Sequence, residues 1–281
     1  MQDIGDEEFA LLKAHLLGVS GIDILVAKRY LFVTRLKEFL DKHRFASFRE
    51  FYYRLHIHKD EALEKQLVES MITNETSFCR DVHPFETLQT AILPEAAARK
   101  TRIPHGFPKR LRILSAGCST GQEPYSIGAA VLEWLEGQHV FRPDDITVLA
   151  IDISPRVLDF ARRGTYEEAD LGRGLPPIFQ LKYFRRKGPN WEVCDALRRM
   201  VNFHELNLSQ PFGHLGAFDC IFCRNVIIYF SMGLKQRIVD QFHTMLSPSG
   251  ALILGASESL YNISEKFAAR NEGKTLFYEA K

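Results

Sequence analysis

The sequence of 281 residues lacks a long apolar run and an excess of either charge. No segment approaches the roughly 18–20 uninterrupted apolar residues that a membrane-spanning helix requires, and the acidic start MQDIGDEEFA has no apolar core of a secretory signal. We therefore expect a cytoplasmic protein that does not insert into a membrane. Basic and acidic residues number 36 and 35, so nucleic-acid binding would have to rest on a local basic patch. We expect no nucleic-acid partner.

Cysteine is also scarce, and its pattern excludes a disulfide scaffold. An odd count of five, scattered through apolar segments, predicts reduced thiols. Cys220 and Cys223 form one C-x-x-C, but a second pair and a neighbouring histidine cluster are missing. We therefore interpret them as core residues and expect no metal site. Apolar residues make up 46% of the chain and charged residues 25%, which is typical of a globular protein able to bury a large core.

The first 73 residues contain little glycine and no proline, and their apolar residues recur at helical spacing. We therefore predict a small all-helical N-terminal domain over residues 1–73. The apolar positions that define the expected helices are Phe9, Leu12 and Leu16; Phe32, Leu36, Phe39 and Leu40; Phe48, Tyr52 and Leu55; and Leu63, Leu67 and Met71.

Positive charge is concentrated in part of this helical region. From Lys28 to Lys59 there are nine Lys or Arg residues against three acids. Lys28, Arg35 and Lys42 are seven residues apart, so they share one flank of a helix. One interpretation is a solvated helix face, and the other is a docking surface for an acidic partner.

The remainder of the chain, 74–281, has a different pattern. We predict a linker between Pro94 and Pro108, rich in basic residues, and then alternating strands and helices. Repeated βα units imply an α/β fold with a doubly wound, mostly parallel, Rossmann-like sheet. The segment at about 175–203 carries two adjacent prolines and a Lys187–Asn190 turn, which indicates a small β insertion. Strands of the main sheet are predicted at 111–116, 146–152, 201–206, 218–224, 251–257 and 275–280.

Two features of this α/β region predict a ligand site. In an open α/β sheet, ligands bind beyond the carboxyl ends of the strands, where the strand order reverses. Gly117 opens a glycine turn after the first strand, although its spacing is not that of a dinucleotide fingerprint. Asp152 ends the second strand, placed to accept both hydroxyls of a ribose. The alternative role of Asp152, a helix N-cap, is already filled by Ser154.

Polar residues also follow the next two strands. The third strand runs into Asn207 and Leu208, and the fourth runs into Arg224 and Asn225. A polar pair at the end of an apolar strand is costly unless it meets partners. Four strand ends thus converge on one cleft, which suits the adenosyl cofactor of methyltransferases better than a nicotinamide dinucleotide.

Four motifs stand out along the chain: NETSFCRD (74–81), SAGCSTGQEPYSIG (115–128), CRNVIIYF (223–230) and GASESL (255–260). In this order they resemble the motifs of the chemotaxis receptor methyltransferase family (CheR-type), and the resemblance covers nearly the whole chain. It implies a class I methyltransferase fold and an enzyme that uses S-adenosylmethionine, without a metal, to methylate glutamate side chains of chemoreceptors. The products would be S-adenosylhomocysteine and a glutamate methyl ester.

The resemblance also implies roles for individual residues. It places Asn74, Thr76 and Arg80 in a loop over the methionine end of the cofactor. It also implies that Glu123 meets the amino group of the cofactor and that Asp152 binds its ribose. Asn207 and Leu208 would flank the adenine, and Arg224 and Asn225 would line the pocket. Arg80 and Tyr229 would lie beside the reacting centre, and Lys28, Arg29 and Arg35 would dock on acidic receptor helices.

Other interpretations stay open at this point. Without the family match, Arg80 could form a structural ion pair with Glu75 or Asp81, and Tyr229 could be a core aromatic. The chain could also be a cofactor-binding adaptor without activity, or a methyltransferase for another substrate. The Lys187–Asn190 turn is shorter than the glycine-rich loop of members that tether a receptor peptide, so we do not expect tethering. We expect a monomer.

Overall fold

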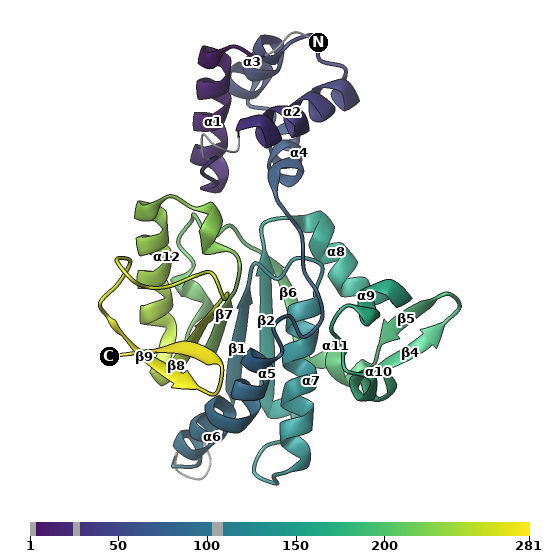
Figure 1. Ribbon diagram of the computed structural model, residues 1–281, viewed down its shortest axis with the longest axis vertical. Coiled ribbons are helices and arrows are strands. Elements are labelled where there is room, and N and C mark those ends of the chain that lie inside the picture. Colours follow the sequence, from purple (N-terminus) through teal and green to yellow (C-terminus); the bar gives the residue numbers. More distant parts are fainter. Residues whose placement is uncertain (1–3, 25–28, 103–108) are drawn as a thin grey trace. The chain divides into compact units, whose positions relative to one another are not determined.

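The structure, a computed structural model, describes residues 4–24, 29–102 and 109–281, and the chain divides into two compact units (Figure 1). The first, called the helical unit below, comprises the described part of 1–73 together with Tyr229–Lys235. The second, called the sheet unit, comprises the described parts of Asn74–Ile228 and of Gln236–Lys281.

The predicted helical character of the N-terminal region is confirmed. Each predicted group of apolar residues falls on one helix and is buried, except that Phe51 replaces Tyr52 as a core aromatic. Side-chain caps begin two helices: Ser47 accepts the N–H of Glu50, and Asp60 accepts the N–H of Leu63. The helices are α1 (Asp6–Ser20), α2 (Arg29–His43), α3 (Phe48–His58) and α4 (Glu61–Met71).

The described part of the sheet unit contains a seven-stranded sheet with the order β6-β2-β1-β7-β8-β10-β9. β1 pairs in parallel with both β2 and β7, so the strand order reverses between β1 and β7. The doubly wound, mostly parallel fold is therefore confirmed, with an antiparallel hairpin at one edge. The strands are β1 (Leu111–Ala116), β2 (Ile146–Asp152), β6 (Val201–Glu205), β7 (Phe218–Cys223), β8 (Leu246–Leu254), β9 (Phe267–Glu272) and β10 (Thr275–Ala280).

Two strands differ from the sequence prediction. β8 begins at Leu246, five residues before the strand predicted at 251–257, because Leu246 pairs with Phe218 before the register shifts. β9 was not predicted, since its sequence FAARNE contributes only Phe267 to the large buried apolar residues. It is an edge strand that pairs with β10 alone, and such strands need little apolar sequence.

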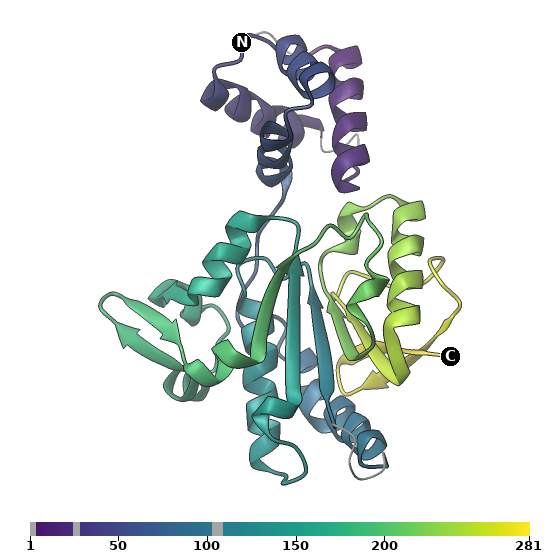
Figure 2. The ribbon, with the colours of Figure 1, turned by 180° about the vertical axis from the view of Figure 1, so that it is seen from behind.

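Helices cover both faces of the sheet. α5 and α7 lie in front of it in Figure 1, and α12 lies on the opposite face, where it is seen in front in Figure 2. Phe242 of α12 packs on Phe212 with ring centroids 5.5 Å apart. The helical segments are α5 (His83–Thr87), η2 (Leu88–Ile92), α6 (Leu93–Thr101), α7 (Gln122–Glu136), η3 (Pro143–Asp145), α8 (Pro155–Arg163), α11 (Asp195–Met200), η4 (Gly213–Leu215), η5 (Ile227–Tyr229) and α12 (Met232–Met245).

The predicted linker at 94–108 is wrong over its first half. Residues up to Thr101 belong to α6, and 103–108 lie outside the described residues. Pro94 stands at the second position of α6, directly after the π-helical turn η2, and this wider turn lets the helix continue past a residue that has no N–H to donate. The alanine-rich segment that follows has high helix propensity, and this property outweighs the proline signal.

The small β insertion is confirmed, but its bounds are shifted toward the N-terminus. The described residues form a three-stranded sheet in the order β3-β5-β4, and 195–200 form α11 instead. β4 and β5 are joined by Gly188 and Pro189, and Gly188 has φ +60°, so the predicted turn is a tight one. The elements are β3 (Thr165–Glu167), α9 (Glu168–Gly172), α10 (Pro177–Tyr183), β4 (Phe184–Lys187) and β5 (Asn190–Val193).

Candidate functional site

The candidate site lies where the carboxyl ends of β1 and β7 meet, at the point where the strand order reverses. Gly117 follows β1 with φ +74°, and its N–H donates to the carbonyl oxygen of Ile151 at 2.8 Å. A Cβ at Gly117 would come within 2.4 Å of the Val226 side chain, which follows β7. Glycine is thus required here both by its backbone conformation and by close packing between the two strand ends.

Asp152, at the end of β2, is buried and tied to the same turn. One carboxylate oxygen accepts the N–H of Ser119 at 2.9 Å, and the other accepts the N–H of Ser154 at 3.0 Å. Burial raises the pKa of Asp152, and hydrogen bonds from the backbone N–H groups of Ser154, Ser119 and Ile153 oppose that shift. These backbone hydrogen bonds fix the carboxylate at the end of β2, where it can accept from hydroxyl donors of a ligand.

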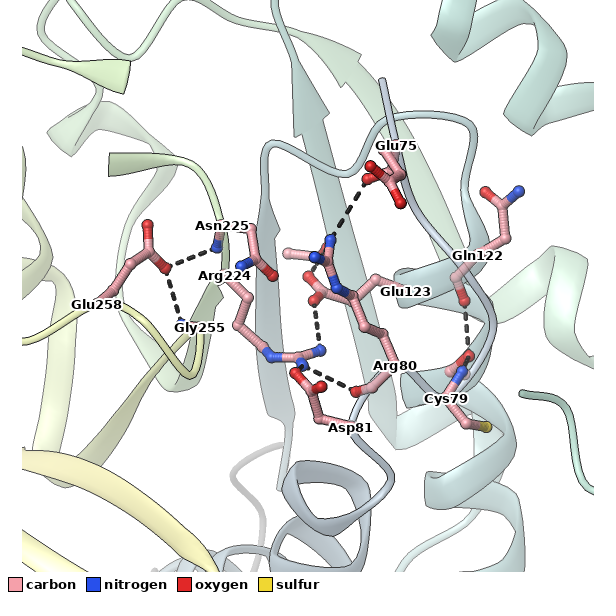
Figure 3. A network of polar contacts seen from close by, with 12 residues as sticks. Glu75, Cys79, Arg80, Asp81, Gln122, Glu123, Arg224, Asn225, Gly255 and Glu258 are labelled. Carbon is pink, nitrogen blue, oxygen red and sulfur yellow. Dashed lines mark hydrogen bonds and ion pairs between the residues drawn. The ribbon is translucent and has the colours of Figure 1, made fainter. Parts of the chain in front are cut away.

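Arg224 lies at the centre of a buried polar network (Figure 3). Its side chain is 2% exposed, and within the described chain its guanidinium has three hydrogen-bond acceptors. These are the Glu123 carboxylate at 3.2 Å, the Asp81 carboxylate at 2.6 Å and the carbonyl oxygen of Arg80 at 2.8 Å. Arg224 therefore joins the ends of β7 and α7 to the segment that carries Arg80.

Glu123 is the second buried charge of this network. Its carboxylate accepts the hydroxyl of Ser115 at 2.8 Å as well as the guanidinium of Arg224. Burial raises the pKa of Glu123, while Arg224 and Ser115 act in the opposite direction. A carboxylate held in this way is fixed in position and remains able to meet a further cation.

The loop 74–82, which carries Arg80, has strained backbone. Cys79, Asp81 and Val82 have φ of +46°, +68° and +53°, although none is glycine. Such residues are rare and gather at functional sites when their surroundings hold them in place. Here the Cys79 N–H donates to the Ser126 hydroxyl at 2.9 Å, and Arg224 binds the next two residues.

The same loop contacts the glycine turn and leaves Arg80 loosely held. The carbonyl oxygen of Asn74 accepts the hydroxyl of Ser119 at 3.1 Å, and Thr76 is half-buried. The Arg80 guanidinium donates to the carbonyl oxygen of Glu75 at 3.4 Å, a long hydrogen bond. Asp81 pairs with Arg224 instead of Arg80, so the structural ion pair considered from the sequence is not seen in the described residues.

Asn225 and the residues after β6 complete the set of strand ends. Asn225 has φ +60°, and its Oδ1 is buried without a hydrogen-bond partner in the described residues. Leu208 is buried, and the side chain of Asn207 accepts the N–H of Ser209 at 2.9 Å. A buried, unpaired acceptor is costly unless a ligand satisfies it, and it suits a donor group on a bound molecule.

Sequence reasoning missed two carboxylates here. Asp81 pairs with Arg224, and Glu258 binds backbone N–H groups of the residues after β7. Both residues stand inside motifs recognised from the sequence, NETSFCRD and GASESL. The motif letters were the available signal, but their contacts depend on partners distant in the sequence.

The remaining predicted residues belong to the helical unit. The carbonyl oxygen of Tyr229 accepts the N–H of Asp23 at 2.9 Å, and the role of Tyr229 beside the reacting centre stays a prediction. Arg29 pairs with Asp6 at 2.6 Å, and Arg35 donates to the carbonyl oxygen of Met71 at 2.7 Å. Both arginines therefore have internal partners as well as exposed surface. Lys28 lies outside the described residues.

Neither a metal-binding cluster nor a membrane-spanning helix is found in the part of the chain that the structure describes. In 4–24, 29–102 and 109–281, no group of three or more His, Cys, Asp or Glu side chains is placed to hold a metal ion. Over those ranges there is also no helix with the length and hydropathy needed to span a bilayer. Burial raises the pKa of the Cys79 thiol, and it raises the pKa values of Cys118, Cys220 and Cys223 well above their usual value, so these four thiols are protonated core residues.

A doubly wound sheet with a glycine turn after β1, an acid after β2 and a polar pair after β7 is the arrangement of an S-adenosylmethionine-dependent methyltransferase. The family model described as "CheR methyltransferase, SAM binding domain" matches residues 74–275. Chemotaxis protein methyltransferase 1 of Pseudomonas aeruginosa is 37% identical over 98% of both chains. Chemotaxis protein methyltransferase of Vibrio parahaemolyticus is 36% identical over 99% of this chain and 98% of its own length. The chain belongs to the CheR methyltransferase family, as its motifs indicated.

Proposed function

We propose that this enzyme transfers the methyl group of S-adenosylmethionine to glutamate side chains of chemoreceptors and forms methyl esters. The observation that supports this proposal most directly is the full-length similarity to proteins named chemotaxis protein methyltransferases. The strand-end site agrees with it, since acids and a glycine turn meet at the switch point of the sheet. We also propose a cytoplasmic location and a monomeric state.

The residues present fit the methyl donor. Asp152 is a buried carboxylate, fixed by backbone N–H groups, for the ribose hydroxyls, and Glu123 is a fixed buried acid for the amino group. The unpaired Oδ1 of Asn225 is an acceptor that a bound donor would satisfy. Asn207 and Leu208 would flank the adenine, Gly117 would let the backbone pass close to the cofactor, and Asn74, Thr76 and Arg80 would lie in the covering loop.

The chemistry asks little of the protein beyond positioning. S-adenosylmethionine supplies an electrophilic methyl group, and a glutamate with a pKa of about 4.3 is already ionised at neutral pH. We propose that the chain supplies neither a metal nor a strong base, and that its residues hold the two reactants in line. Charge is lost toward the transition state, so a tight grip on the substrate carboxylate would slow the reaction. We therefore assign Arg80 to the methionine end of the cofactor.

Calorimetric titration of the purified chain tests the cofactor site. We expect binding of S-adenosylmethionine and S-adenosylhomocysteine and no binding of NADH, because the glycine turn lacks the dinucleotide spacing. The Asp152→Ala variant should weaken binding of both adenosyl ligands roughly tenfold or more, since two charge-assisted hydrogen bonds to the ribose are lost. A folded sample that binds neither adenosyl ligand would refute the proposed function.

We propose that α2 docks on acidic receptor helices, with Lys28, Arg29 and Arg35 on the docking side. Arg29 and Arg35 have internal partners, so exposed Lys42, on the flank of Arg35, gives a cleaner test. Lys42→Glu should raise KM for the receptor about five- to tenfold and leave kcat unchanged, with a larger effect at low salt. Lys266→Glu, a reversal at a half-exposed lysine of the sheet unit, is the control and should leave KM unchanged. Equal effects of the two variants would argue against docking through α2.

A further inference from the structure

Glu258 follows β8 and is buried, at 8% exposure, beside the residues that leave β7. Within the described chain its carboxylate accepts four backbone N–H groups. One oxygen accepts from Asn225 at 2.6 Å and from Gly255 at 2.8 Å. The other accepts from Val226 at 3.0 Å and from Ile228 at 3.2 Å. Figure 3 shows the first pair of bonds.

This arrangement fixes a turn that backbone pairing alone would not hold. The N–H groups of Asn225, Val226 and Ile228 point at one carboxylate, as in the concave anion-binding turns that proteins build from successive backbone amides. A buried carboxylate is stable only when such donors replace its water. Gly255 allows the close approach, because a Cβ there would lie 2.8 Å from both the Asn225 backbone nitrogen and the Glu258 carboxylate.

The turn that Glu258 holds carries two parts of the candidate site. Asn225 has left-handed backbone and the buried, unpaired Oδ1, so its side-chain direction depends on how this turn is held. Val226 packs against Gly117 at the start of the glycine turn. A shift of the turn would therefore move an acceptor after β7 and loosen the packing after β1 together.

We propose that Glu258 is a positioning residue for methyl-donor binding, which it supports by holding the turn 225–228 through backbone N–H groups. This inference rests on the proposed cofactor site at Asn225. Glu258 itself acts through the turn and not by contact with the ligand. Only a carboxylate can serve here, because it offers two acceptor oxygens to four donors and presents no hydrogen of its own.

The test is a double-mutant cycle between Glu258→Gln and Asn225→Ala. Glutamine has the same shape but directs an NH2 group at two of the backbone donors. We expect each single variant to raise the Kd of S-adenosylhomocysteine about tenfold to a hundredfold, since loss or misplacement of one buried hydrogen-bond acceptor weakens binding by a factor of that size. The double variant should be no weaker than the weaker single variant, because both remove the same contact. Affinity is measured by calorimetry on folded protein.

A matched control is Asp219→Asn, near the amino end of β7. Asp219 is a buried carboxylate that accepts the N–H of Arg112 at 3.0 Å and pairs with Lys100 at 3.1 Å. This substitution should lower stability and leave the Kd of the folded protein unchanged. Should Glu258→Gln fail to fold, Glu258→Asp, which keeps the charge but has a shorter reach, replaces it in the cycle.

The outcomes separate the inference from the proposed function. Additive losses in the cycle, or an unchanged Kd for Glu258→Gln alongside a weakened Asn225→Ala, would overturn the role of Glu258 and leave the site intact. An unchanged Kd for Asn225→Ala would overturn both assignments. A Kd that rises in both single variants and rises no further in the double variant supports the positioning role.

Discussion

Replacement of Arg224 by methionine is expected to lower the free energy of unfolding by about 3 kcal/mol or more, and to abolish methyl transfer. The side chain of Arg224 is only 2% exposed, and its guanidinium binds the carboxylates of Glu123 and Asp81 and the carbonyl oxygen of Arg80. Methionine fills a similar volume but leaves the Glu123 carboxylate, 13% exposed, without its cation. It also releases the strained loop at Asp81. Urea denaturation followed by circular dichroism measures the loss.

Arg270→Met is the matched control for this prediction. Arg270 also lies between two carboxylates, those of Glu95 and Glu279, but its side chain is 38% exposed. Exposed ion pairs contribute about 0–1 kcal/mol, so this variant should be nearly as stable as the parent and remain active. Arg224→Lys should be intermediate, because lysine keeps the charge and loses the planar fork that reaches three acceptors. Equal losses for Arg224→Met and Arg270→Met would show that burial of the network contributes nothing.

Replacement of Arg80 by alanine is expected to lower kcat/KM about a hundredfold with little change in the free energy of unfolding. Among the described residues, the Arg80 guanidinium donates to Glu75 at 3.4 Å, and the residue is half-exposed, so the fold depends little on it. If Arg80 organises the methionine end of the cofactor, the Kd of S-adenosylhomocysteine should rise with the loss of activity. Radiolabel transfer to a receptor fragment and calorimetry provide the two measurements.

Arg173→Ala is the control for Arg80. Arg173 lies 3.9 Å from the carboxylate of Glu75 and is 61% exposed, so its replacement removes a neighbouring positive charge and leaves the hydrogen bonds of Cys79 and Asp81 in place. Near-normal turnover of Arg80→Ala would remove Arg80 from the site. A fall in kcat with an unchanged Kd would instead assign Arg80 to an interaction made in the transition state.

Most of the fold could be predicted from the sequence because its strong periodicity agrees with the tertiary structure. β1 and β2 are buried apolar strands, and their bounds match the prediction. Errors occurred where a local signal competed with tertiary contacts. Pro94 indicated a linker but stands at the start of α6, and β9 owes its place to pairing with β10 and not to apolar residues of its own.

The candidate site was predictable to a smaller extent. Gly117 and Asp152 could be proposed from their positions directly after predicted strands, a rule that needs only the order of elements. The place of Arg224 in the structure could not, because its acceptors stand 101 and 143 residues away in the sequence. The partners of Glu258 are backbone N–H groups, which carry no sequence signal at all. Contacts of these two kinds become visible only in three dimensions.

The helical unit is assembled from two stretches that lie far apart in the sequence, and this matters for the design of hybrid proteins. Ile22 pairs with Phe230, and the N–H of Asp23 binds the carbonyl oxygen of Tyr229, so the unit is built from two separate stretches of the gene product. A chimaera that exchanges only residues 1–73 between relatives would join one protein's helices to another protein's 229–235 segment. Receptor preference should therefore transfer more completely when both stretches are exchanged together.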